Sequence, residues 1–171
     1  MDPLQKLSVR SIAVYLLCTA AICHPRATAR DREAVLEAAV ATITDDELRE
    51  HAGLLADDTL EGRAAGSRGG RAAGRYIESQ LQRAGLTPAG DRGGFVQRFS
   101  PGYQNVLAKI PGTDSSLREE CIVVGAHYDH VGYGSQRNSN GPIGYIHNGA
   151  DDNASGVATL LEMVDALTRG G

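Results

Sequence analysis

Residues 121–127 read CIVVGAH, and this stretch decides the fold class. It is an almost continuous apolar run, which is typical of a β-strand buried on both faces. After a loop rich in glycine, asparagine and serine at 131–147, residues 156–167 (GVATLLEMVDAL) have the apolar spacing of an amphipathic helix. A strand, a loop and a helix in this order predict an α/β layered domain.

Upstream of this unit the sequence predicts three helices and two short strands. The first helix covers 31–43, and the second runs from Thr44, which opens a capping-box pattern with Glu47, to about Leu55. The third covers 71–84 and ends at Gly85. The strands are expected at 95–99 and 105–110. Residues 57–70 are rich in glycine and charge and predict a surface loop between the second and third helices.

The N-terminus has the composition of a secretory signal. Lys6 and Arg10 precede an apolar run at 12–23, and the small residues of Ala27-Thr28-Ala29 follow. Residues 1–29 are therefore predicted to be a signal peptide, with an uncleaved anchor as the alternative. The apolar run is too short to span a bilayer comfortably. We expect residues 30–171 to form one domain, secreted or held in the periplasm or cell envelope.

Composition excludes several classes of function. The chain has 171 residues and a net charge of −4, and its arginines are scattered, which argues against a nucleic-acid surface. Cys18 and Cys23 lie in the predicted signal, and Cys121 remains alone, so neither a disulfide framework nor a thiolate metal cluster is expected. We interpret Cys121 as a small buried hydrophobe. The sequence has no Gly-x-Ser-x-Gly motif and no plausible catalytic cysteine, which disfavours a nucleophilic hydrolase.

Candidate metal ligands stand at the end of the predicted strand and at the start of the last helix. His127 and Asp129 would share one strand face, and a metal-binding imidazole commonly donates its second ring proton to a carboxylate. Asp151 and Asp152 in NGADDNASG (148–156) precede the helix, where acids also serve as simple caps. Imidazole and carboxylate together suit zinc, and one carboxylate can bridge two ions about 3.5–4 Å apart. The alternative is that the polar side chains at the strand end and at the helix start are solvated and bind no metal.

Four motifs carry a family resemblance. They are LEGRAAGSRGGRAAGRYI (60–77), NVLAKIPG (105–112), VVGAHYDHVG (123–132) and NGADDNASGVATLLE (148–162). In this order they resemble the zinc exopeptidases related to bacterial leucyl aminopeptidases and glutamate carboxypeptidase, family twenty-eight of the metallopeptidases. The resemblance implies the N-terminal part of an α/β/α sandwich with a mixed sheet, of the phosphorylase/hydrolase-like, zinc-exopeptidase type, preceded by helices.

The resemblance also implies roles for individual residues. His127 matches a terminal zinc ligand, Asp129 the carboxylate that orients it, and Asp152 the carboxylate that bridges two zinc ions. Asp151 matches a variable position. The peptide bond after the bridging acid is cis in relatives, which here is Asp152–Asn153. The implied substrate is a peptide, and the implied reaction is hydrolysis of the aminopeptidase type.

The chain also departs from the family. Relatives carry, farther along, a Glu-Glu pair that supplies the general base and a ligand, then another acid and a final histidine, and this sequence shows none of them. We therefore expect weak or absent zinc binding and no activity from this chain alone. A non-catalytic truncated remnant or binding module is one alternative, and an acyltransferase similar to glutaminyl cyclases is another.

Two further expectations complete the sequence reading. Since a parallel sheet needs neighbouring strands, the absence of later elements predicts exposed apolar surface and poor solubility. The other histidines, His51, His130 and His147, are expected at the surface or in support of the site.

Overall fold

The computed structural model describes residues 28–171, apart from 101, 113, 118, 140, 170 and 171. Most of the predicted signal segment, 1–27, therefore lies outside the described residues. Thr28 caps the first helix, with its Oγ1 3.2 Å from the backbone N of Asp31. Within the described part of the chain, no helix has both the length and the hydropathy needed to cross a membrane.

Four α-helices form the larger part of the fold: α1 Ala29–Val40, α2 Asp45–Leu55, α3 Arg68–Arg83 and α4 Ser155–Arg169. They confirm the four predicted helices, with ends shifted by a few residues. Local signals set those ends. Thr44 accepts a hydrogen bond from the Glu47 N–H at 3.3 Å at the start of α2, and Gly85 takes the left-handed conformation (φ +74°) after α3.

The described strands form two small antiparallel pairs. β2 Val96–Ser100 pairs with β3 Tyr103–Val106 as a hairpin, and β1 Thr87–Pro88 pairs with β4 Ala108–Lys109. The predicted strand at 95–99 corresponds to β2, and the one at 105–110 is divided between β3 and β4. The fold thus contains both helices and sheets, as an α/β class requires.

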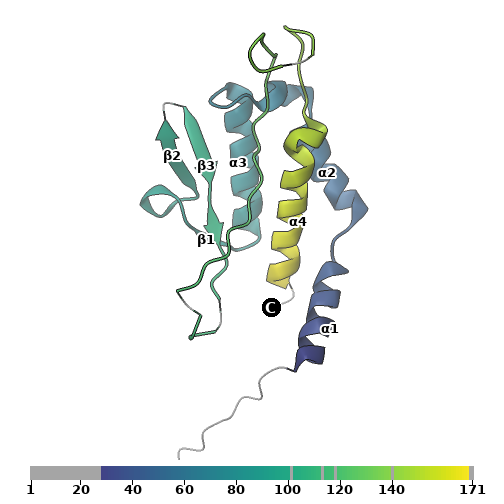
Figure 1. Cartoon of the computed structure of the whole chain (residues 1–171), viewed down its shortest axis with the longest axis vertical. Coiled ribbons are helices and arrows are strands. Elements are labelled where there is room, and N and C mark those ends of the chain that lie inside the picture. The colour runs from purple at the N-terminus through teal and green to yellow at the C-terminus, as the bar shows by residue number, and fades with distance from the viewer. Residues whose placement is uncertain (1–27, 101, 113, 118, 140, 170–171) are drawn as a thin grey trace, which may run out of the picture.

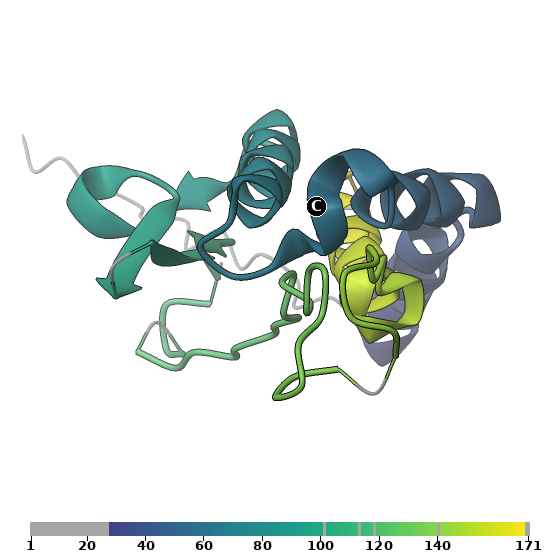
Figure 2. The same ribbon diagram turned by 90° about the horizontal axis from the view of Figure 1, so that it is seen from above.

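The core lies where α3, α4 and the end of α2 meet. Figure 1 shows α4 between α3 and α2, with the β2–β3 hairpin on the other side of α3, and Figure 2 shows from above that α2 and α4 lie together on one side of α3 and the hairpin on the other. The buried apolar side chains of the core come mainly from these helices and from the segment after β1: Leu55, Ala73, Ile77, Leu81, Phe95, Val157, Leu161 and Val164. This packing places the N-terminal end of α4 beside α2.

The structure corrects the prediction of a buried strand at 121–127. These residues form no strand, and Ile122 and Val123 are 92% and 88% exposed. Cys121 is exposed as well, so its interpretation as a buried hydrophobe is wrong. The physical reason is that a strand of this type is buried by paired neighbours, and the described residues supply none beside it. The exposed apolar surface that we expected is confirmed here.

The prediction of a surface loop at 57–70 is also wrong in part. Residues 58–63 form a 3-10 turn, η1 Asp58–Arg63, in which Leu60, Gly62 and Arg63 are buried. The composition of the segment is that of a loop, but its main chain packs under the segment that follows His127. Gly132 N–H donates to the Gly62 carbonyl at 3.0 Å, and His130 N–H donates to the Arg63 carbonyl at 3.2 Å.

Candidate metal-binding site

Asp152 lies in an irregular turn at the entrance to α4. The turn, η3 Ala150–Ala154, follows Gly149, whose φ is +57°. The peptide bond between Asp152 and Asn153 is cis, as the sequence resemblance implies. The Asn153 side chain accepts a hydrogen bond from the Gly156 N–H at 3.2 Å and so caps the helix. Capping is therefore done by Asn153, which leaves the exposed Asp152 carboxylate available for other contacts.

His127 and Asp152 meet across the two segments. The His127 Nε2 lies 3.2 Å from Asp152 Oδ1. On the other side of the ring, the His127 Nδ1 is 3.1 Å from the main-chain carbonyl of Asp129 and 3.8 Å from its carboxylate. The main-chain carbonyl of Asp129 is thus the nearer partner of the ring, and the carboxylate lies just beyond hydrogen-bonding distance. Either contact favours a proton on Nδ1 and leaves Nε2 free as a ligand.

His130 is a neighbour of Asp152 that the sequence did not assign. Its Nδ1 lies 3.5 Å from Asp152 Oδ2, and its side chain is 15% exposed. Burial lowers the pKa of His130, while the Asp152 carboxylate raises it. Strand alternation predicted that His130 points away from His127, but residues 127–130 do not form a regular strand, so both rings reach the same carboxylate.

The other two histidines lie elsewhere. His51 contacts Tyr76 and Glu162, and the His147 Nε2 lies 3.0 Å from the Pro142 carbonyl. Neither contacts Asp152 through an interaction seen in the described part of the chain.

The residue types and spacing fit part of a zinc site. Two ligand atoms at zinc bonding distance from a tetrahedral ion lie roughly 3.3 Å apart, and the His127 Nε2 to Asp152 Oδ1 distance is 3.2 Å. The fit is incomplete. Among the described residues, no group of three or more histidine, cysteine, aspartate or glutamate side chains is arranged to hold a metal ion. The described residues thus present two donors, and a zinc site ordinarily needs three or four.

The loop before Asp152 is anchored to the end of α2. The Asn148 side-chain amide donates to the Ala56 carbonyl and to the Asp58 carboxylate, both at 2.6 Å. Gly149 packs directly on the His130 ring, since a Cβ placed on this glycine would lie 2.6 Å from ring carbons. The segments that carry the two candidate ligands are therefore in direct contact.

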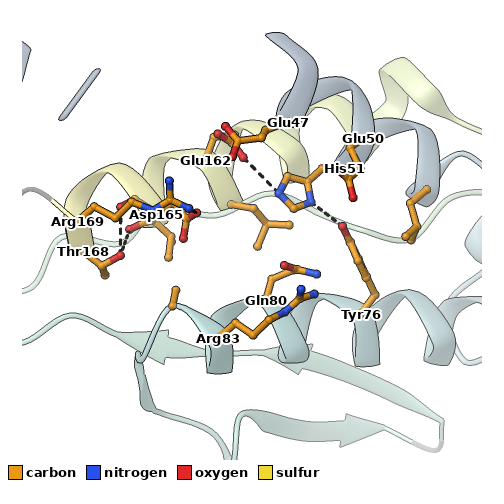
Figure 3. A pocket seen from close by; sticks show the side chains of 14 residues that line it. Glu47, Glu50, His51, Tyr76, Gln80, Arg83, Glu162, Asp165, Thr168 and Arg169 are labelled. Atoms are coloured by element: carbon orange, nitrogen blue, oxygen red, sulfur yellow. Dashed lines mark hydrogen bonds and ion pairs between the residues drawn. The ribbon is translucent and has the colours of Figure 1, made fainter. Parts of the chain in front are cut away.

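Two cavities lie near the helices. One of about 380 Å³ adjoins Asp129 and is lined in part by Tyr128, Phe99 and Tyr103. The other, of about 610 Å³, lies between α2, α3 and α4 and contains neither His127 nor Asp152. Figure 3 shows that second cavity, where His51 joins Tyr76 to the buried Glu162. Of these two cavities, the first includes one candidate site residue, Asp129, and neither includes His127 or Asp152.

Known proteins match the part of the chain that carries these residues. Residues 105–171 match the sequence profile of peptidase family M28. A probable leucine aminopeptidase of Arthroderma otae is 34% identical over 89 residues, covering 51% of this chain and 21% of that protein. Leucine aminopeptidase 1 of Trichophyton rubrum is 32% identical over 103 residues, covering 58% of this chain and 25% of that protein. No solved structure matches the chain significantly.

Residues 105–171, which carry the candidate ligands, are therefore similar to the peptidases of this family. The chain spans about a fifth to a quarter of the length of the curated relatives that it matches.

Proposed function

We propose that the protein is the N-terminal part of a zinc-dependent aminopeptidase that hydrolyses peptide bonds with a two-zinc site. One observation carries the proposal. The His127 Nε2 and Asp152 Oδ1 atoms come from two separate segments and lie 3.2 Å apart, next to the N-terminal end of α4. The names of the fungal relatives support an aminopeptidase activity. The same relationship supports an α/β/α sandwich with a mixed sheet as the complete fold.

Each residue has a distinct part in this proposal. His127 binds a zinc ion through Nε2, and Asp129 holds the Nδ1 proton and with it the ring orientation. The two carboxylate oxygens of Asp152 face His127 and His130, and this carboxylate would serve as the bridge between two zinc ions. When bound, zinc supplies a Lewis acid and a water of lowered pKa. The described residues provide only two such donors, so we expect weak zinc binding and no turnover from them alone.

The location of the protein is part of the same proposal. Residues 1–29 act as a secretory signal, and residues 30–171 function outside the cytoplasm. A peptide is the expected substrate, and neither nucleic acid nor a membrane is an expected partner.

The proposed ligands can be tested by calorimetric titration of residues 30–171 with Zn²⁺. We expect weak binding that is lost in His127→Ala and in Asp152→Ala, because each removes one of only two donors. Asp151→Ala is the matched control, since it removes the adjacent exposed carboxylate and should bind zinc as the unaltered chain does. Asp129→Asn should weaken binding by about tenfold, the lower end of effects seen for groups that orient a metal ligand.

Two results would contradict the proposal. Equal zinc affinity in Asp152→Ala and the unaltered chain would exclude Asp152 as a ligand. Hydrolysis of an aminoacyl-nitroanilide by residues 30–171, abolished in Asp152→Ala, would show that these residues suffice for activity, against our expectation.

A further inference from the structure

Arg63 is the most deeply buried charged residue among those described, with a relative exposure of 0%. It lies at the end of η1, between the segment that carries His127 and the loop that carries Asp152. Burial lowers the pKa of its guanidinium, and the carboxylates of Asp129 and Asp152 oppose that effect. A buried cation is costly unless its donors are satisfied, so its hydrogen bonds show what it stabilises.

The guanidinium donates to main-chain carbonyls of three segments. Its Nε donates to the Tyr128 carbonyl at 2.9 Å, between His127 and Asp129. Its Nη1 and Nη2 donate to the carbonyls of Asn148 at 2.6 Å and Gly149 at 2.9 Å, and Nη1 also contacts the Leu55 carbonyl. A planar guanidinium with five donors can make such a set of bonds, and a lysine ammonium in the same place cannot.

The Gly149 carbonyl links Arg63 to the turn that carries Asp152. The same oxygen accepts the Ala154 N–H at 3.2 Å, and this bond closes the turn that contains Asp152. On the other side, the main chain of Arg63 accepts the His130 N–H at 3.2 Å. One residue therefore contacts the main chain on both sides of the His127–Asp152 pair.

The backbone of Arg63 indicates that this position is held in place by its surroundings. Its φ is +51°, in the left-handed region that is unfavourable for a residue with a Cβ. Such a conformation persists where the surrounding structure over-determines it, and it is found often at functional sites. A lysine substitution keeps this backbone cost and the positive charge, and therefore isolates the loss of the guanidinium bonds.

We propose that Arg63 is a positioning residue, whose guanidinium fixes the His127 segment and the Asp152 turn relative to each other so that both side chains can bind one metal ion. The metal-binding part of this inference rests on the proposed function. The positioning part does not rest on the proposed function, because the hydrogen bonds that hold the two segments together are all made by protein atoms.

Hydrogen exchange followed by mass spectrometry, without metal, tests the positioning. In Arg63→Lys we expect exchange at residues 128–132 and 149–154 to rise by about tenfold, the effect of losing about one net hydrogen bond in each segment. Exchange in the second half of α3, residues 76–83, should stay unchanged, because it is the first turn of this helix that packs on η1. Arg71→Lys is the matched control, because Arg71 also donates to a main-chain carbonyl, that of Gly66, but is exposed and contacts neither segment.

A Zn²⁺ titration of the same variants completes the test. Arg63→Lys should bind at least about tenfold more weakly than Arg71→Lys, in line with other groups that orient metal ligands. Exchange that rises equally in residues 76–83 of α3 and in the two segments would overturn the inference, since Arg63 would then support the fold as a whole. Unchanged exchange and unchanged zinc affinity would overturn it while leaving the proposed function intact. If the unaltered chain binds no zinc but the two segments loosen selectively, the proposed function fails and the positioning role stands.

Discussion

At the scale of single residues, Gly62 shows how tightly the candidate site is packed. Its φ is +64°, and a Cβ added there would lie 2.5 Å from the His147 carbonyl oxygen and 2.6 Å from that of Gly132. These neighbours are main-chain atoms, which cannot move aside as the end of a flexible side chain can. Gly85 has a similar φ of +74°, but an added Cβ would meet nothing within 4 Å.

We predict that Gly62→Ala lowers the free energy of unfolding by about 3 kcal/mol, because left-handed strain and a main-chain clash add together. Gly85→Ala should cost about 1 kcal/mol, the left-handed term alone. Urea denaturation of both variants measures the difference. Equal losses would mean that the segment after His127 can move away from η1 at no cost, contrary to the packing described.

At the scale of helices, α2, α3 and α4 are joined by a polar chain through His51. The His51 Nδ1 lies 2.6 Å from the Tyr76 hydroxyl, and its Nε2 lies 3.2 Å from Glu162 Oε1. The Glu162 side chain is 4% exposed. Burial raises the pKa of Glu162, with Glu47 adding to the rise and His51 opposing it. Figure 3 shows this chain beside the cavity between the three helices.

The raised pKa of Glu162 predicts a pH dependence of stability. Between the ordinary value, 4.5, and the raised value, the folded state binds more protons than the unfolded state, so stability falls as pH rises through this window. Glu162→Gln has no such titration, and its amide oxygen can still accept the His51 N–H. The melting temperature of Glu162→Gln, relative to the unaltered chain, should therefore be higher at about pH 7 than at about pH 4.

Glu37→Gln, which removes an exposed carboxylate of α1, is the matched control for the loss of one glutamate charge. A profile for Glu162→Gln that runs parallel to that of the unaltered chain would show that Glu162 does not titrate differently on folding.

At the scale of the whole molecule, the exposed segment 121–127 is the main departure from a closed fold. Ile122, Val123 and Val124 are all exposed, and the segment forms no described strand pair. Apolar side chains on an unpaired extended backbone present both an apolar surface and free hydrogen-bonding groups, which is the usual setting for edge-to-edge association. The poor solubility expected from the sequence remains a prediction, and this segment is its physical source.

We predict that Val123→Lys reduces the association of residues 30–171, because a charge on an unpaired strand edge opposes pairing between copies. Light scattering at rising protein concentration measures the effect. Leu36→Lys is the control, since Leu36 is also exposed but lies within α1, whose backbone groups are already bonded. A similar reduction in both variants, or a monomeric unaltered chain with a cooperative melt, would contradict the role of this segment.

The sequence by itself determined the helices and the approximate positions of their ends. Thr44, Gly85 and the apolar spacing of α3 and α4 act over one or two helical turns, so local pattern was enough to predict them. The choice of His127, Asp129 and Asp152 as candidate ligands also came from local motifs and a family resemblance. The structure adds their proximity, with the His127 Nε2 3.2 Å from Asp152.

Only the tertiary structure decided the parts that depend on distant neighbours. Residues 121–127 have the composition of a buried strand, but burial needs partner strands, and in the described chain they stand exposed. Arg63 lies in a segment with the composition of a surface loop, yet it is buried because carbonyls from three other segments converge on its guanidinium. His130 reaches Asp152 because the backbone there is irregular. Local periodicity contains no information about contacts between residues so far apart in the chain, so the fold alone assigns these three roles.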